Sequence, residues 1–340
     1  MTMIVRFGFV AMSTILENAS PSRTMTFANF SKLNDREAGI RKMERIAEEN
    51  LHNTLRIMKH ANAHDIHMYR FSSKLIPLST HEDLLDWDPF PVLRPSMKEI
   101  GDYAKKTGMR TSFHPDHFCV FSTNRPDVLV KSERDLDYHI RMLEAMELPE
   151  TVKCNIHMGG AYGDKKLSGE RFVQQFGALT DRYKHRVTLE NDDKTFDVRE
   201  TIVAAEAVGV PMVLDIHHHA VNSGDVTMDE LSAGLWPRIA RTWTLEEQRL
   251  GLEEGGLPPK IHASSPKSLS DPRGHADNVE PEPLMQFLRS VAASTPRIDC
   301  MLEAKHKDAA LLKLMEDLKE MAALGNGIRI LDGGTVEIDP

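Results

Sequence analysis

Three short apolar segments decide how this chain folds: Cys154-Asn155-Ile156-His157, Val187-Thr188-Leu189-Glu190 and Val213-Leu214-Asp215. Each has the length of a buried β-strand and ends on a histidine or a carboxylate. In a parallel α/β architecture, ligands bind beyond the carboxyl ends of the strands. A histidine, a glutamate and an aspartate at three such ends therefore predict one shared site, and these side chains are typical metal ligands.

Strand-like segments alternate with amphipathic helical segments along the chain. Eight strands are predicted, at residues 4–9, 66–71, 109–113, 152–157, 186–190, 211–215, 259–262 and 297–303. Helices are predicted at residues 34–59, 97–106, 133–146, 169–183, 198–208 and 308–324. The first helix is expected to begin with a capping box of Asn34 and Glu37. This alternation predicts an α/β fold, a TIM-type (β/α)8 barrel, in a single domain over residues 1–340.

Composition limits the possible functions. The 340 residues are 41% hydrophobic and 27% charged, which suits a globular chain, and no apolar run has the length of a signal peptide or a membrane span. We therefore expect a cytoplasmic protein. The three cysteines, Cys119, Cys154 and Cys300, form no Cys-x-x-Cys pair and predict neither disulfides nor a thiolate zinc site. The net charge of −9 argues against nucleic-acid binding unless bound divalent metal concentrates positive charge locally.

Six predicted strands end in potential metal ligands. They are His114, His157, Glu190, Asp215, His262 and Glu303, and His217-His218-His219 and His275 lie in the loops that follow. Imidazole and carboxylate together suit zinc, manganese or iron. A single residue of this kind is more often a hydrogen-bonded rim residue, but six at successive strands favour two or three ions, and multi-metal sites favour phosphate-ester hydrolysis. Which histidine of residues 217–219 binds metal stays open.

Lys260 precedes His262 by two residues, so both side chains face the barrel interior. A lysine beside cations is repelled unless it is neutral, modified or paired. We expect a neutral amine, a carbamate, or an ion pair with Glu303 or Asp215. Two long, polar, proline-rich loops, residues 72–95 and 263–279, are expected at the mouth of the barrel, where they would grip a substrate.

A series of motifs resembles the UV damage endonucleases of the UvdE/UvsE type along nearly the whole chain. They are Arg6-Phe7-Gly8-Phe9, Tyr69-Arg70-Phe71-Ser72-Ser73, Ser112-Phe113-His114-Pro115, Tyr138-His139-Ile140-Arg141-Met142-Leu143, Asn155-Ile156-His157-Met158-Gly159-Gly160, Leu189-Glu190-Asn191-Asp192-Asp193, Asp215-Ile216-His217-His218, Lys260-Ile261-His262-Ala263-Ser264-Ser265-Pro266-Lys267 and Glu303-Ala304-Lys305. The resemblance implies a barrel related to endonuclease IV that holds up to three divalent ions, typically manganese, with zinc, cobalt or magnesium as alternatives. It also implies a DNA repair activity that nicks immediately 5′ of cyclobutane dimers and 6-4 photoproducts, leaving a 3′-hydroxyl and a 5′-phosphate.

The resemblance also assigns roles to individual residues. It implies one metal group of His114, His157 and Glu190, and a second in which Glu190 is shared with Asp215, His262 and Glu303. It selects His218 and pairs it with His275 on a third ion. It matches Lys260 to a lysine near the metals, so that Glu190, Lys260 and Glu303 are the expected catalytic residues.

UV-damaged double-stranded DNA is the implied partner, bound by a monomer. The residues expected to contact it are Arg70, Lys74, His117, Phe118, Asn191, Lys267 and Arg273. His117 and Phe118 lie at the loop tip that relatives insert beside the lesion, and many relatives have Gln in place of His117. A photoproduct weakens stacking, so flipping it out costs less than flipping normal bases.

Three alternative functions stay open at this point. An abasic-site endonuclease of the endonuclease IV type would use the same ligands on another lesion. A metal-dependent sugar isomerase or epimerase of the xylose isomerase type also places His, Glu and Asp at barrel strand ends, with fewer metals. A non-catalytic binder of damaged DNA would bind without nicking. Cleavage of plasmid DNA separates these possibilities.

Overall fold

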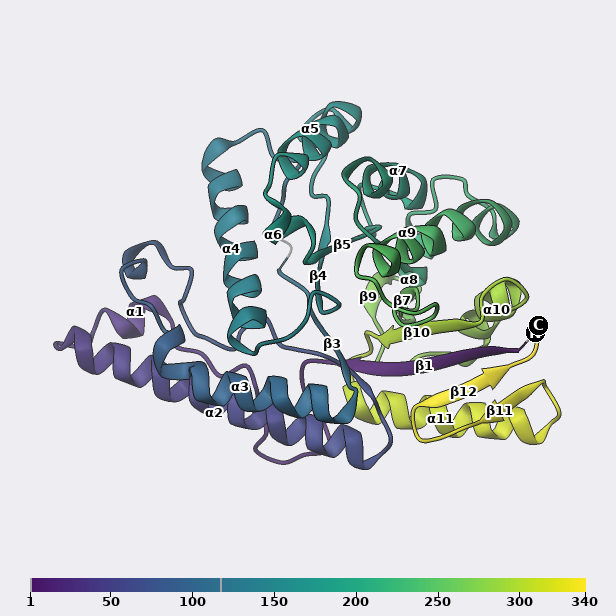
Figure 1. Ribbon diagram of the computed structural model, residues 1–340, viewed down its shortest axis with the longest axis horizontal. Coiled ribbons are helices and arrows are strands. Elements are labelled where there is room, and N and C mark those ends of the chain that lie inside the picture. The colour runs from purple at the N-terminus through teal and green to yellow at the C-terminus, as the bar shows by residue number, and fades with distance from the viewer. Residues whose placement is uncertain (1, 117) are drawn as a thin grey trace.

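The computed structural model describes residues 2–116 and 118–340, in which eight parallel strands close into a barrel (Figure 1). The barrel strands are β1 (Met3–Val10), β2 (Met68–Arg70), β3 (Arg110–Phe113), β4 (Lys153–His157), β5 (Val187–Glu190), β6 (Met212–Asp215), β7 (Lys260–Ala263) and β10 (Arg297–Leu302). Neighbouring strands in this order are hydrogen-bonded, and β10 pairs with β1 to close the ring. The predicted TIM-type barrel is confirmed.

Helices surround the strands, as Figure 1 shows. The long helices are α2 (Arg36–Ala63), α3 (Phe90–Thr107), α4 (Pro126–Ala145), α5 (Lys165–Gly177), α7 (Val198–Val208), α9 (Trp236–Arg249), α10 (Pro281–Ala292) and α11 (Lys307–Ala323). Shorter helical segments are α1 (Phe27–Phe30), α6 (Asp181–Lys184), α8 (Ile216–Val221), a 3₁₀ turn η1 (Glu82–Leu84) and a π-helical turn η2 (Glu230–Leu235). No helix in the described ranges is both long enough and apolar enough to cross a bilayer.

Several helix boundaries differ from the sequence prediction. The predicted capping box at Asn34 is wrong by one residue, because Asp35 is the N-cap of α2 and accepts a hydrogen bond from the Ala38 amide at 3.2 Å. Helix α3 begins at Phe90 with Pro91 in its first turn and continues through Pro95, and α4 begins at Pro126. A proline in the first turn has no helical hydrogen bond to lose, so it extends these helices toward their N-termini.

Other differences concern segments with weak sequence signals. The helix predicted for residues 169–183 is two helices, α5 and α6, and Thr180 is the N-cap of the second. The long loop after β7 contains a hairpin of β8 (Pro266–Ser268) and β9 (Asp271–His275). A second hairpin, β11 (Ile328–Ile330) and β12 (Thr335–Ile338), ends the described chain, and β12 pairs antiparallel with the amino-terminal half of β1. That half is available because β1 pairs with β2 only through its last two residues.

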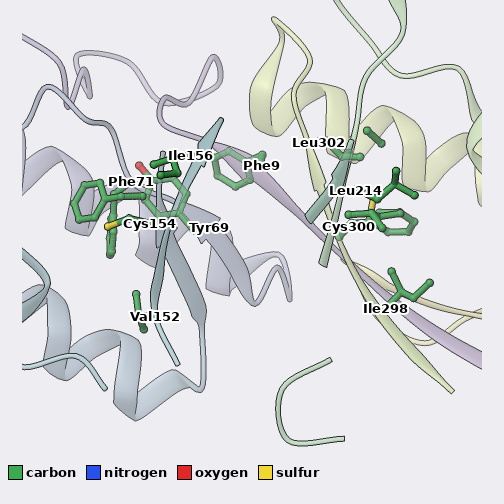
Figure 2. Close-up of a cluster of buried hydrophobic side chains, with 14 of the residues drawn as sticks. Phe9, Tyr69, Phe71, Val152, Cys154, Ile156, Leu214, Ile298, Cys300 and Leu302 are labelled. Carbon is green, nitrogen blue, oxygen red and sulfur yellow. The ribbon is translucent and has the colours of Figure 1, made fainter. Parts of the chain in front are cut away.

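Side chains on the strands alternate between two environments. On β10, Ile298, Cys300 and Leu302 belong to the main hydrophobic cluster, which also contains residues of α10 and α11, so they lie between barrel and helices (Figure 2). The intervening Asp299 pairs with Lys260 in the β-ladder and contacts arginines of β1 and β3, so it faces inward. The alternation of strand residues therefore puts the apolar core outside the barrel and a polar column inside it.

Candidate metal centre

The inward-facing residues at the carboxyl ends of the strands form a ring of histidines and carboxylates. Strand register sets the neighbours: His157 lies beside Glu190 on β4 and β5, and Asp215 lies beside His262 on β6 and β7. Glu303 follows the last residue of β10. Because the strands are parallel, residues distant in sequence reach one end of the barrel together.

A first donor group consists of His114, His157 and Glu190, whose ligand atoms all lie within 4.8 Å of one another. Nε2 of His114 is 3.1 Å from Oε2 of Glu190. Nδ1 of His114 lies 2.9 Å from the Pro115 carbonyl oxygen, and Nδ1 of His157 lies 3.3 Å from the Glu190 carbonyl oxygen. A carbonyl can only accept, so each Nδ1 carries a proton, and in the neutral imidazole Nε2 then presents the lone pair.

A second donor group shares Glu190 and adds Asp215, His262 and Glu303, again with ligand atoms within 4.8 Å. Nδ1 of His262 lies 3.2 Å from Oε1 of Glu190 and 3.0 Å from Oε1 of Glu303. Asp215 is the N-cap of α8, and its Oδ1 accepts a hydrogen bond from the His218 amide at 2.7 Å. Its second oxygen stays available on the side of the ring.

The histidines of residues 217–219 differ in how close they lie to the carboxylates. His218 is the member nearest the carboxylates, with Nδ1 3.5 Å from Oε1 of Glu190 and 3.7 Å from Oδ2 of Asp215. The ring of His275 lies 6.4 Å from that of His218 and 5.6 Å from that of His217. The structure therefore brings His218 and His275 to the edge of the ring, although the described residues show no third group of three converging donors there.

The carboxylates of the ring differ in their electrostatic surroundings. Burial acts to raise the pKa of Glu190, but electrostatic interaction with the imidazoles of His262 and His157 outweighs it and holds that pKa well below its usual range. Burial of Glu303 is likewise outweighed by Arg70 and His262, which hold its pKa well below its usual range. For Asp215, burial prevails and raises the pKa to about 7.

Two histidines carry the opposite shift. Burial acts to lower the pKa of His262, but Glu190 and Glu303 raise it to about 9. Burial also opposes protonation of His218, but Asp215 and Glu190 raise its pKa to about 9. In the metal-free ring, protons on these imidazoles therefore balance the carboxylates, and a bound cation would displace them.

The donor set fits a divalent cation in both chemistry and geometry. The bare Nε2 of His114 faces a carboxylate oxygen at 3.1 Å, so a proton or a cation must lie between them. Oδ2 of Asp215 and Nδ1 of His275 are buried without a hydrogen-bond partner among the described residues. Unsatisfied buried acceptors are costly, and a metal ion would satisfy several at once.

Lys260 lies one layer below the ring. It is only 4% exposed, and its Nζ donates a hydrogen bond to Ser112 Oγ at 3.1 Å. Burial, reinforced by the positive charge of Arg110, lowers its pKa well below the usual range. Within the described chain it forms no ion pair with Glu303 or Asp215, which removes that alternative and leaves the neutral amine and the carbamate.

The basic residues predicted to bind DNA lie around the mouth of the barrel and differ in their exposure and in their ion-pair partners. Arg70 donates a hydrogen bond to Glu303, and Lys74 is exposed at the start of the loop after β2. On the hairpin of β8 and β9, Lys267 lies 3.1 Å from Asp271, and Arg273 lies 3.8 Å from Asp193. These exposed pairs are weak, so both cations can turn toward a polyanion.

Two further predictions concern Asn191 and the loop tip. Asn191 is fully buried, and its amide exchanges two hydrogen bonds of 2.9 Å with the backbone of Asp215. Its position does not agree with the predicted contact with DNA, because it has no free polar atom at the surface, and it instead positions Asp215. At the loop tip, Phe118 is 71% exposed, while His117 lies outside the described residues.

One residue of the site was missed in the sequence analysis. Asn155 donates a hydrogen bond to Oε2 of Glu190 and accepts one from Thr188 Oγ1 at 2.8 Å, so it orients the shared carboxylate. Asn155 precedes His157 by two residues, as Lys260 precedes His262. The same two-residue period would have identified it as an inward-facing residue.

The known proteins to which this chain is similar are UV endonucleases. A family model described as UV-endonuclease UvdE matches residues 5–330. The UV DNA damage endonuclease of Bacillus pumilus is 41% identical over 335 residues, which cover 98% of this chain and 99% of that protein. That of Halalkalibacterium halodurans is 37% identical over 339 residues, covering 99% of this chain and all of the relative.

Among solved structures, SacUVDE aligns with a TM-score of 0.77 at 27% identity, covering 94% of this chain and 99% of that one. Endonuclease IV from Thermus thermophilus aligns with a TM-score of 0.53 at 14% identity, covering 93% of this chain and 99% of that one. The second likeness is one of fold alone.

Proposed function

The chain belongs to the UvdE family of UV endonucleases, and from that membership we propose that it is a DNA repair endonuclease acting on UV photoproducts. It cuts the phosphodiester immediately 5′ of cyclobutane dimers and 6-4 photoproducts and leaves a 3′-hydroxyl and a 5′-phosphate. The single barrel carries the whole activity and acts as a monomer in the cytoplasm.

The observation that carries this proposal is the position of Glu190 in both donor groups. Glu190 would be a ligand to both ions of a pair, and such a pair would supply the charge that stabilises an attacked phosphodiester. We propose two or three manganese ions, with zinc, cobalt or magnesium as alternatives, held by His114, His157, Glu190, Asp215, His262 and Glu303, and by His218 and His275 at the edge. When bound, divalent ions lower the pKa of a water molecule and neutralise charge that develops on the phosphodiester.

The chain itself orients these groups. Backbone carbonyls fix the ring orientation of His114 and His157, and Asn155 fixes the shared carboxylate of Glu190. Such support keeps ligands in place without reorganisation during the reaction. Glu190 and Glu303 are the proposed catalytic carboxylates. Lys260 completes the catalytic set as a neutral amine or as a carbamate, and intact mass measured in bicarbonate distinguishes these two forms.

Rim residues bind the DNA around the lesion. Arg70, Lys74, Lys267 and Arg273 contact phosphates, which fix register but carry no information about the lesion. Phe118, together with His117, fills the space that the flipped photoproduct leaves. The high exposure of Phe118 supports this role, because an apolar side chain in water gains by insertion into a base stack.

The test is nicking of supercoiled plasmid, irradiated and unirradiated, in the presence of manganese. We expect nicks in irradiated plasmid only, and we expect a chelator or Glu190→Gln to abolish them. The surface variant Lys313→Met serves as the matched control and should nick like the wild type. Nicking of abasic plasmid alone would make the protein an abasic-site enzyme. Inertness on every plasmid would favour the isomerase, or a damage binder if irradiated DNA is still bound.

A further inference from the structure

The first residue of α11, Lys307, has a strained backbone beside the metal centre. It lies four residues after Glu303, is half-buried, and has a φ of +53°, in the left-handed region. A side chain with a Cβ adopts this conformation at a cost, which glycine would avoid. Strain of this kind persists where the surrounding structure imposes it, and it occurs often at functional sites.

The neighbours of Lys307 fix this conformation from both sides. On one side, the Lys305 and His306 amides donate to the carbonyls of Ala276 and Asp277, both at 3.0 Å. On the other side, the buried carboxylate of Asp308 accepts hydrogen bonds from the Thr14 amide at 2.8 Å and from the hydroxyl of Ser13. The turn is thus tied to the loops after β7 and β1, and Lys307 must bridge two fixed points.

The side chain that this backbone carries is a lysine, and among the described residues the ion pairs of the nearby Glu303 go to Arg70 and His262 and not to Lys307. Besides burial, the groups that act on its pKa are Arg70, which lowers it, and Glu303, which raises it. Arg70 is already hydrogen-bonded to Glu303, and Nδ1 of His262 lies 3.0 Å from the same carboxylate, so Glu303 does not balance the charge of Lys307 alone. If a metal ion binds the Glu303 carboxylate, that carboxylate no longer balances the charges of Arg70 and Lys307. An anion from outside the protein can then neutralise both side chains.

We propose that Lys307, together with Arg70, binds a phosphate of the substrate backbone next to the metal centre. This inference rests on the proposed function. A lysine ammonium is a compact point charge that suits a phosphate oxygen, and an arginine beside it adds a planar donor pair. Lys307 is a substrate-binding residue that also positions the scissile linkage, and the strained turn holds it four residues after Glu303, at the carboxyl end of β10.

The experiment measures binding of a photoproduct-containing duplex whose scissile phosphate is replaced by a non-cleavable methylene-phosphonate linkage. Fluorescence anisotropy with manganese at several salt concentrations gives the affinity and its salt dependence. We expect Lys307→Met to weaken binding about tenfold and to reduce the slope of log affinity against log salt by about 0.9, the value for one phosphate contact. Lys307→Arg should bind nearly as tightly as the wild type.

Lys307→Gly separates the charge from the strain. It removes the ammonium and relaxes the left-handed backbone, so it should bind as weakly as Lys307→Met while melting at the same temperature as the wild type or higher. Lys313→Met, on the same helix, should change neither quantity. Wild-type affinity and salt slope in both Lys307→Met and Lys307→Gly would overturn the inference while nicking by the wild type stands. Failure of the wild type to nick irradiated plasmid would overturn the proposed function and this inference with it.

Discussion

At the amino end of the barrel, the buried Asp299 accepts hydrogen bonds from Arg6 at 3.0 and 2.6 Å and from Arg110 at 2.6 Å, so both of its oxygens are used. At the carboxyl end, the buried Asp215 uses one oxygen to cap α8, and its other oxygen accepts no hydrogen bond from the described residues. Both carboxylates face the interior of one barrel and both are almost wholly shielded from water. They differ in whether the chain itself satisfies them.

This difference teaches how to interpret buried charge. Both ends receive a carboxylate from the same part of the chain. Strand β10 carries Asp299 at the amino end of the barrel, called the lower end below, and Glu303 follows four residues later at the carboxyl end, called the upper end. At the lower end, Arg110 also stacks on Trp243 at 5.0 Å, and the charges form a closed structural network. At the upper end, carboxylates and imidazoles face one another, and some of their acceptor atoms have no hydrogen-bond donor among the described residues. Burial alone therefore does not indicate function, whereas unsatisfied donor atoms do.

Asp215→Asn is expected to have the largest effect on both activity and stability. Nicking should fall by on the order of 10³-fold, because a main electrostatic element of the site is lost. The metal-free variant should nevertheless be more stable than metal-free wild type at pH 8. Burial raises the folded pKa of Asp215 to about 7, so the wild type loses stability as pH rises toward that value, and asparagine keeps the helix cap without the charge. Urea unfolding in the presence of a chelator measures the free energy of unfolding of both proteins. A less stable variant would contradict the claim that the Asp215 carboxylate is unsatisfied in the metal-free protein.

The matching change at the other end is Asp299→Asn. It leaves Arg6 and Arg110 without their carboxylate, and we expect a loss of about 3–5 kcal/mol in the free energy of unfolding. The nicking rate per folded molecule should fall far less than in Asp215→Asn. Chemical denaturation and plasmid nicking measure the two quantities. An Asp299→Asn protein that is as stable as the wild type but inactive would place function at the lower end as well.

Manganese should stabilise the protein through the upper end only. At a hundredfold excess over the dissociation constant, binding to the folded state contributes about 2.7 kcal/mol. We expect the melting temperature of the wild type and of Asp299→Asn to rise with manganese, and that of Asp215→Asn to rise much less. Equal shifts in all three proteins would place the bound ions outside the ring.

The smallest expected effect concerns Lys153, which is buried against Glu246 near the lower end. Burial outweighs the charge of Glu246 and lowers the pKa of Lys153 to about 8, from an ordinary value of 10.5. Between these values the folded lysine has lost its proton and the unfolded one has not, so stability should rise with pH, by at most about 1.4 kcal/mol per pH unit. Lys153→Met should show a flatter dependence between pH 8 and 10, and Lys313→Met should not differ from the wild type.

Much of this molecule could be predicted from local sequence. The eight strands, the helix at residues 198–208 and the histidines and carboxylates at the strand ends follow from periodicity, because side chains repeat every two residues on a strand face and every three to four on a helix face. Parallel strands in a barrel then bring their carboxyl ends together, so His157, Glu190 and Asp215 converge. The resemblance to a known family added the choice of His218 over its two neighbours.

The tertiary structure decided what depends on partners distant in sequence. It buried Asn191 against the backbone of Asp215 and paired Asp299 with two arginines. It also constrained the turn at Lys307, where a lysine adopts a left-handed backbone conformation. It also set which nitrogen of His114 carries the proton, through a carbonyl that only the folded loop brings near. Which residues face the interior follows from local sequence, because it is a local property of the backbone. Which of them are satisfied and which await a ligand depends on contacts between strands, and only the closed barrel makes those contacts.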